Sequence, residues 1–453
     1  MALSRLLWLA ALAALPGAVL AAYALGTRGR RLYALAAACA AVLTAVAAIP
    51  LALEFFGPLS SGSAPLALLS TVLVPFAALL WLMAVVTTPS ARMDDAGLAR
   101  TAAACLLGMA AFLTAAPAAL VLIWIATAAI LAAGHRGARF KAARRVIFSH
   151  LGLSAIFLAA GAALAAWARG RGDAALEQWG VALILSAVVL RKGIFPFHAW
   201  IPEVFDQGRI GPAALFNAPQ LGTYAALVLA VPYACPTLLR TAAGLALITA
   251  VYGSFMALYQ ADARRACGYL FVSQSALVIA GLELPGRGAL VGALLLWVCS
   301  GVALAGLSRA VLALEARRGR LRLDVRHGGY ERMPLLAVSF LIMGLAVANF
   351  PGTLGFIGGE MLVRGAVDSF PGLGLFAVAA VAMSGLAAIR MYFSLFCGRK
   401  DSGAHLKMGR VESLGFAAAA LILLGFGLAP GGLTRVLSRA SAAVMASRQS
   451  PNR

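Results

Sequence analysis

Charged residues are scarce in this chain of 453 residues. Only 12% of the residues are Asp, Glu, Lys or Arg, about half of the roughly 25% that is usual in soluble domains, whereas 62% are hydrophobic. This composition excludes an ordinary soluble domain and places the chain in a membrane. Only helices or closed barrels satisfy the backbone there, and the apolar runs are too long for barrel strands. We therefore expect an all-α integral membrane protein.

Motifs of soluble catalysis are also absent. The chain has no G-x-x-x-x-G-K-[ST] phosphate loop, no H-E-x-x-H metal motif and no serine nucleophile elbow. The six cysteines lie in or beside apolar segments without a C-x-x-C pair, so we expect them to be small core residues. The sequence also lacks ligation for an iron–sulfur cluster or a flavin. We predict no metal and no cofactor, and any electron transfer belongs to another subunit.

Long apolar segments predict about 14 transmembrane helices. They lie at 6–25, 32–53, 64–87, 101–115, 117–133, 146–167, 179–201, 213–231, 238–259, 266–284, 288–314, 333–362, 373–396 and 413–433. Only Ala116-Pro117 separates the fourth from the fifth, so one long kinked helix is an alternative there. The first segment has a second interpretation as a secretory signal. Its apolar run continues into Tyr23-Ala-Leu-Gly26, however, and another span follows at once.

The formal net charge of +21 is concentrated in alternate loops. These basic residues are Arg28, Arg30 and Arg31; Arg136, Arg139, Lys141, Arg144 and Arg145; Arg317, Arg318, Arg320, Arg322 and Arg326; and Arg399, Lys400, Lys407 and Arg410. The positive-inside rule places such loops in the cytoplasm and both termini outside. Arg435, Arg439, Arg448 and Arg453 fall on the other side. This placement indicates membrane topology, and we predict no nucleic-acid partner.

Two segments interrupt apolar spans with glycine and proline. They are Arg191-Lys-Gly-Ile-Phe-Pro-Phe-His-Ala-Trp-Ile-Pro-Glu203 and Ala348-Asn-Phe-Pro-Gly-Thr-Leu-Gly-Phe-Ile-Gly-Gly-Glu360. A helix break leaves backbone groups unpaired at membrane depth, which is tolerated only beside a cavity or packed protein. Paired breaks at corresponding places are typical of inverted-repeat transporters with a midplane site. We expect Pro196 and Pro351 to occupy equivalent positions.

The placement of the breaks gives the domain prediction. We expect N-terminal helices one to three in residues 1–100, a first repeat of helices four to eight in 101–231, a second repeat of helices nine to thirteen in 238–396, and helix fourteen with a tail in 397–453.

Three motifs carry a family resemblance. Phe195-Pro-Phe-His-Ala-Trp-Ile-Pro-Glu203 resembles the "FPFHxWLPxA" signature of the antiporter-like, proton-conducting membrane subunits of respiratory complex I, membrane hydrogenases and Mrp-type antiporters. Gln260-Ala-Asp-Ala-Arg-Arg265, with Tyr269 and Ser273-Gln-Ser275 after it, resembles that family's "QxDxKR" stretch. Pro351-Gly-Thr-Leu-Gly-Phe-Ile-Gly358 resembles its second broken helix. The order and spacing are those of the family, so the chain is identified as a divergent member.

The resemblance implies an ion-translocating subunit in a bacterial-type inner membrane, associated with other membrane subunits of a hetero-oligomeric complex. At most, it implies the membrane part of an NADH:quinone oxidoreductase-like complex without a redox centre of its own. In this family, protons move along buried lysines, histidines and glutamates at the level of the two breaks.

Several positions depart from the family pattern. The family's glutamate after a tryptophan is Ile125 here, after Trp124. Its lysine five residues before the proline is Arg191, with Lys192 adjacent. An arginine does not release a proton at physiological pH, so only Lys192 could relay one. Other family positions fall on Asn217 and Gly222 in span eight, on no counterpart within 288–297 in span eleven, and on Gly359, beside Glu360, in span twelve.

The resemblance and the cost of buried charge give the site predictions. Candidates for the ion path are Arg191, Lys192, His198, Glu203, Asp206, Asn217 and Glu360. We expect Lys192 to face an interior path near Glu203 or Asp206, and Arg191 to make a fixed ion pair or carbonyl contacts.

Packing roles are the alternatives for several of these and neighbouring side chains. His198 and Trp200 also fit packing at the broken helix. Asp262 and Arg265 fit an ion-paired turn at the cytoplasmic face. Arg309 fits a helix end, with its cation snorkelling to the interface.

Two functional classes stay open on the sequence. The first is an ion-translocating subunit with a reduced proton path. The second is a non-conducting scaffold that docks a partner, for example a carbonic-anhydrase-like subunit in inorganic-carbon uptake. Neighbouring genes would discriminate the two, since redox subunits favour the first and a large soluble zinc protein favours the second.

Overall fold

A computed structural model describes residues 2–56, 65–89, 92, 94–369, 371–398 and 408–449. The predicted basic residues Arg399, Lys400, Lys407 and Arg453, and the side chain of Arg448, lie outside the described residues. The described chain is helical and contains no β-strand, with one isolated bridge between Asp262 and Arg322. The all-α prediction is confirmed.

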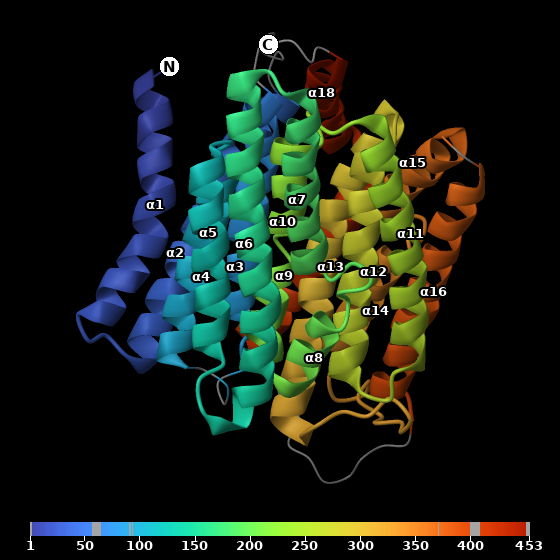
Figure 1. Ribbon diagram of the computed structural model, residues 1–453. Helices are drawn as coiled ribbons and strands as arrows, with labels where there is room; N and C mark the ends of the chain where they lie inside the picture. The colour runs from blue at the N-terminus through green and yellow to red at the C-terminus, as the bar shows by residue number, and fades with distance from the viewer. Residues whose placement is uncertain are drawn as a thin grey trace.

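The helices follow one another along the chain as Figure 1 shows. Their bounds are α1 Ala2–Ala24, α2 Gly29–Phe56, α3 Pro65–Val86, α4 Asp95–Phe112, α5 Pro117–Gly134, η2 Ala138–Phe140, α6 Lys141–Arg171, α7 Ala174–Lys192, α8 Trp200–Gln207, α9 Ile210–Asn217, α10 Leu221–Ala225, η3 Ala226–Ala230, α11 Pro236–Tyr259, α12 Ala263–Glu283, α13 Arg287–Arg318, α14 Pro334–Val347, α15 Leu354–Ser369, α16 Pro371–Phe396, α17 Arg410–Leu428 and α18 Gly431–Gln449.

The span count agrees with the prediction. Within the described residues, 12 helical segments are long and apolar enough to cross a membrane. Two shorter apolar helices, Trp8–Ala24 in α1 and Pro334–Val347 in α14, supply the remaining crossings, the second together with α15. α4 and α5 are separate helices, because Pro117 starts a new helix after the turn. The tail also forms a helix, α18, which packs on α13 and α3.

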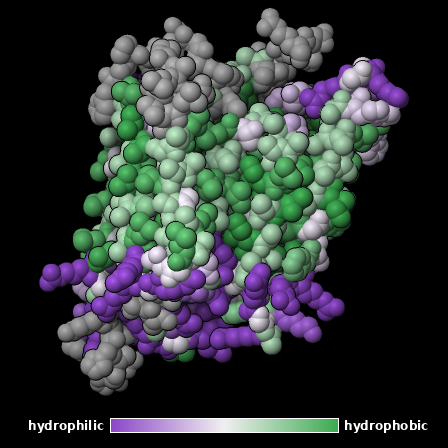
Figure 2. Space-filling view, turned by 90° about the vertical axis from the view of Figure 1, so that its left-hand side faces the viewer, coloured by the Kyte–Doolittle hydropathy of each residue, from purple (hydrophilic) through white to green (hydrophobic). Residues whose placement is uncertain are grey.

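Polar groups collect at the two ends of the bundle. The loops that follow α1, α5 and α13 lie at its lower end in Figure 1, and the start of α1 and the helix α18 lie at the upper end. Figure 2 shows an apolar band across the middle of one face and hydrophilic side chains below it. We call the end with Arg28–Arg31, Arg136–Arg145 and Arg317–Arg326 the basic end. The side of the membrane on which it lies stays a prediction.

α12 and α13 form the centre of the bundle. They are buried along their spanning lengths, which is expected of helices that are apolar on all sides. The peripheral helices α2, α5 and α6 expose one apolar side instead.

Three spans are interrupted along their length. α7 ends at Lys192, because Gly193 adopts a φ of 64° and Pro196 follows. α14 ends at Val347, before Asn349 with a φ of 52° and Pro351. A third interruption, which we did not predict, separates α9 from α10 at Pro219 and Gln220, whose φ is 55°. The equivalence of the first two breaks under an inverted repeat stays a prediction.

Candidate functional site

Arg191 is held rigidly at the end of α7. Its side chain is 3% exposed and donates to the carbonyl oxygen of Trp124 at 3.2 Å and to Thr127 Oγ1 at 2.8 Å. The guanidinium also lies 4.2 Å from the ring centre of Trp124 and 4.4 Å from that of Phe216, a cation–π arrangement with both rings. The predicted carbonyl contact is present, and these aromatic rings replace a carboxylate as its neighbours.

Lys192 has no such partners. It is 2% exposed, and within the described chain its ammonium donates no hydrogen bond and forms no ion pair. The stem passes close to α10, where a Cβ on Gly222 would lie 2.8 Å from the Lys192 Cγ and Cδ atoms. Gly222, at a position where the family has a cation, therefore makes room for the lysine of the neighbouring helix.

The residues after the break satisfy the backbone that it frees. The Trp200 indole donates to the carbonyl of Leu190 at 2.8 Å, and Thr249 Oγ1 accepts from the Phe195 amide at 3.1 Å. His198 stacks on Phe195 and meets the edge of Tyr252, with ring centres 5.8 and 4.6 Å apart. Its buried Nδ1 has no hydrogen-bond partner among the described residues. Trp200 thus has a packing role, and His198 keeps one nitrogen available.

The acidic candidates Glu203 and Asp206 belong to a different group. Arg265 pairs with Asp206 at 3.2 Å and Glu203 at 3.6 Å, and Arg320 also pairs with Asp206. Neither carboxylate forms an ion pair with Lys192, so the expectation that one of them accompanies Lys192 is wrong. The physical reason is that α8 turns these side chains toward the loops of the basic end.

The Gln260–Arg265 motif forms the ion-paired turn that we expected. Asp262 caps α12 by accepting from the amides of Arg264 and Arg265, and Arg320 donates to its other oxygen at 2.6 Å. Burial raises the pKa of Asp262, against these hydrogen bonds. Arg264 itself pairs with Glu315 at 2.5 Å. The cluster joins α8, α12 and α13 and is structural in character.

Glu360 is not buried. Its side chain is 42% exposed and pairs with Arg364, one turn later on α15, at 2.6 Å. The prediction of a buried charge here is therefore wrong, because α15 turns Gly358 and Gly359 inward and Glu360 outward. Asn349, at the break itself, has a buried Oδ1 that finds no hydrogen-bond partner in the part of the chain that the structure describes.

Several polar side chains gather at the third break, and the sequence did not predict this cluster. Gln220 donates to Ser300 Oγ on α13 at 3.1 Å and accepts from Thr223 at 3.1 Å. Trp297 donates to the carbonyl of Pro219 at 3.0 Å. Asn217, a predicted path residue, is buried and donates to Ala213 one turn back at 2.9 Å. Pro219 was the signal that could have revealed this break.

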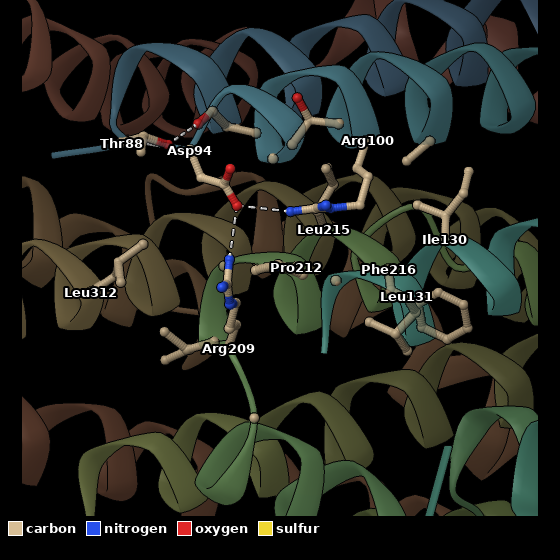
Figure 3. A pocket seen from close by; sticks show the side chains of 18 of the residues that line it. Thr88, Asp94, Arg100, Ile130, Leu131, Arg209, Pro212, Leu215, Phe216 and Leu312 are labelled. Atoms are coloured by element: carbon tan, nitrogen blue, oxygen red, sulfur yellow. Dashed lines mark hydrogen bonds and ion pairs between the residues drawn. The ribbon is translucent and has the colours of Figure 1, made fainter. Parts of the chain in front are cut away.

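A cavity of about 480 Å³ lies between α3, α4, α5, α9 and α13. Within the described chain, seven arginines line it: Arg92, Arg100, Arg139, Arg191, Arg209, Arg264 and Arg309. Asp94 is the one acidic residue in this lining. Figure 3 shows Asp94 between Arg100 and Arg209, at 2.9 and 3.1 Å, with apolar side chains such as Leu215 and Leu312 nearby.

Arg309 differs from its prediction. It is 5% exposed and donates to Thr88 Oγ1 at 3.0 Å, so it does not snorkel to the interface. α3 and α9 cover this part of α13, which leaves the cation facing the cavity.

Comparisons with known proteins support the family resemblance. A family described as NADH:quinone oxidoreductase/Mrp antiporter, TM matches residues 150–385, just over half of the chain. NADH-quinone oxidoreductase subunit N of Chloroflexus aggregans is 28% identical over 308 residues, 64% of this chain and 62% of that protein. The Jannaschia sp. subunit N is 29% identical over 265 residues, 56% of this chain and 54% of that protein. The matched regions thus span about half to three fifths of these curated relatives.

Solved structures show the same fold over nearly the whole chain. A chain of the Mrp complex from Dietzia sp. superposes with a TM-score of 0.87 at 18% identity, covering 99% of this chain and 100% of that one. A chain of respiratory complex I from Thermus thermophilus gives a TM-score of 0.83 at 22% identity, with coverages of 96% and 99%. Both are chains of multisubunit membrane complexes. From its family match, the chain belongs to the NADH:quinone oxidoreductase/Mrp antiporter transmembrane family.

Proposed function

We propose that the chain is a proton-translocating membrane subunit of a hetero-oligomeric complex, with Lys192 as the group that gains and loses the proton. The single observation that carries the proposal is Lys192 itself, a buried lysine at the end of a broken helix that has no hydrogen bond or ion pair to any described residue. Charged groups inside a membrane are costly and usually serve a pathway. The names of the relatives, NADH-quinone oxidoreductase subunit N, agree with this role.

The neighbouring arginine makes Lys192 the better choice for proton transfer. Arg191 is fixed by a carbonyl, a hydroxyl and two aromatic rings, and a guanidinium holds its proton at physiological pH. A primary amine can exist in both forms. We infer that Arg191 supplies a fixed positive charge at the end of α7, and that Lys192 gains and loses the proton.

Polar side chains near the third break could continue the proton path from Lys192 toward α13. Gln220, Thr223 and Ser300 are buried, and Gln220 is hydrogen-bonded to each of the other two at 3.1 Å. Hydroxyl and amide groups of this kind hold water rather than release protons. We propose that water between Lys192 and this group replaces the histidine and lysine found at these positions in the family.

A scaffold without ion flux is the second candidate. The observation that favours it is the exposed Glu360. Among the described residues of the second break, the buried polar atom without a partner is then Asn349 Oδ1, which belongs to an amide and does not titrate. In that case the fold would serve to dock a partner, and Lys192 would contribute only packing and charge.

Proton uptake by vesicles that contain the purified complex tests the proposal. We expect Lys192→Ala to abolish uptake, and Lys192→Arg to preserve assembly but not uptake, because arginine keeps the charge and cannot release it. Lys141→Ala is the matched control, since Lys141 is exposed at the start of α6. Normal uptake by both Lys192 variants, in complexes that assemble like the wild type, would favour the scaffold.

A further inference from the structure

The arginine-lined cavity carries more positive charge than its own residues neutralise. Seven cations face one carboxylate, and Asp94 is shared between two of them, Arg100 and Arg209. A second carboxylate, Glu315, holds Arg264. Among the described residues, Arg191 and Arg309 are buried in this cavity and have no carboxylate partner.

Two partly buried arginines, one of them in the lining of this cavity, do have carboxylate partners. Arg264 is paired with Glu315 at 2.5 Å, and Arg317 with Glu412 at 2.6 Å. Arg309 has only the Thr88 hydroxyl at 3.0 Å. A buried cation without a counter-ion costs several kcal/mol, so the uncompensated arginines of the cavity are best explained by a negative charge supplied from outside the chain.

The chemistry of guanidinium groups defines the ligand. Their planar forks match the oxygen pairs of carboxylates and phosphates. A cavity of about 480 Å³ has the size of sites for organic ligands and exceeds the needs of a bare inorganic anion. Leu98, Leu131, Leu215 and Leu312 add apolar surface to the same lining. The ligand therefore has a charged head and an apolar part.

We propose that this cavity binds an organic oxyanion, a carboxylate or phosphate group attached to an apolar part, with Arg209 and Arg309 at the head group. Arg309 Nη1 lies beside the start of α9, 3.6 Å from where a Cβ on Gly211 would be. Asp94 occupies one side of Arg209 and competes with the incoming anion. Two sources supply such a group, a soluble organic acid and an anionic phospholipid from the surrounding membrane.

The position of the cavity agrees with anion entry. Arg92 and Arg139 of the lining are exposed and lie in loops of the basic end, and a cleft lined by one sign of charge concentrates ions of the other sign. This inference does not depend on proton transfer through Lys192. An anion site at this place would serve a transporting subunit and a scaffold equally.

Ligand-induced stabilisation of the purified full-length protein tests the site. The protein is placed in nanodiscs of phosphatidylcholine, and its unfolding midpoint is measured with octanoate or inorganic phosphate. Native mass spectrometry of protein from nanodiscs with added phosphatidylglycerol measures retained lipid. We expect octanoate to raise the midpoint, or phosphatidylglycerol to be retained over phosphatidylcholine. The first result identifies a soluble acid as the source, and the second identifies a lipid.

Variants decide whether the binding occurs in the cavity. Arg309→Gln and Arg209→Gln should weaken binding about tenfold or more, because each removes a charged hydrogen-bond donor. Asp94→Asn should tighten ligand binding, because it removes the carboxylate that competes for Arg209. If Asp94 had only a structural role, this substitution would not tighten binding. Arg171→Gln is the control, because Arg171 is exposed and lies at the C-terminal end of α6, away from the cavity. Arg209→Gln still tests the site if Arg309→Gln fails to fold.

Three outcomes would overturn the proposal. The first is that neither octanoate nor phosphatidylglycerol binds. The second is that binding is equal in wild type, Arg209→Gln and Asp94→Asn. The third is that only inorganic phosphate binds, which contradicts the apolar part of the ligand.

Discussion

His135 joins the end of α5 to the start of α9. The ring is fully buried, with Nδ1 2.7 Å from the Leu131 carbonyl, and Nε2 accepts from the Arg209 amide at 3.0 Å. These partners require a neutral imidazole that carries its proton on Nδ1. Burial lowers the pKa of His135, the charges of Arg209 and Arg100 lower it further, and the Leu131 hydrogen bond opposes them only in part.

A pH dependence of stability follows from this residue. The pKa of His135 is lower in the folded state than the ordinary value of about 6.5, so the unfolded chain binds the proton more tightly. The contribution of His135 to stability is therefore present above about pH 6.5 and is lost as the pH falls through that value toward the folded pKa. We expect His135→Gln to reduce the slope of the unfolding midpoint against pH between about 5 and 7.

The control for this prediction is His150→Gln on α6, whose ring is only partly buried. This variant should keep the wild-type slope. If His135→Gln kept that slope as well, another group would be responsible for the pH dependence.

At the scale of elements, α13 and α15 approach each other through glycines. A Cβ on Gly292 would lie 2.5 Å from the Leu362 amide nitrogen and 2.7 Å from the Gly358 carbonyl oxygen. A Cβ on Gly358 would lie 2.9 Å from the Leu296 nitrogen. Small residues permit this contact between backbones, which is a common way of packing membrane helices. The contact fixes the helix that follows the second break.

Gly292→Ala should therefore lower stability. The added methyl group meets backbone atoms that cannot rotate away, and overpacking of this kind costs about 1–3 kcal/mol. The unfolding midpoint of the purified protein is the measurement. Gly244→Ala on α11 is the matched control, because nothing lies within 4 Å of its Cβ position and alanine favours the helix. An unchanged midpoint for Gly292→Ala would contradict the close approach.

At the scale of the whole molecule, the sequence predicted the bundle and its two main breaks. Span length and composition are local properties, and so are the Gly193, Pro196 and Pro351 positions that end helices. The direction in which individual side chains point was harder to predict from the sequence. Glu360 faces outward and Arg309 inward because of the neighbours of α15 and α13, which hydropathy does not encode.

The candidate site shows the same limit. Lys192 was identified because a cation beside a helix break is visible in the sequence, and Arg191 makes the predicted carbonyl contact. The arginine cavity was not predicted, since its lining comes from loops and helices far apart in the chain, such as Asp94, Arg209 and Arg309. Only the packed bundle brings them together.

A structure of the assembled complex, at a resolution that shows ordered water, tests the central claim most directly. A relay needs a continuous hydrogen-bonded path, so the account predicts water in contact with Lys192 Nζ and further water reaching the Gln220 and Ser300 group. The partner subunits must leave this path open to one surface. A dry pocket, with Lys192 Nζ donating only to backbone carbonyls, would contradict proton transfer through this chain.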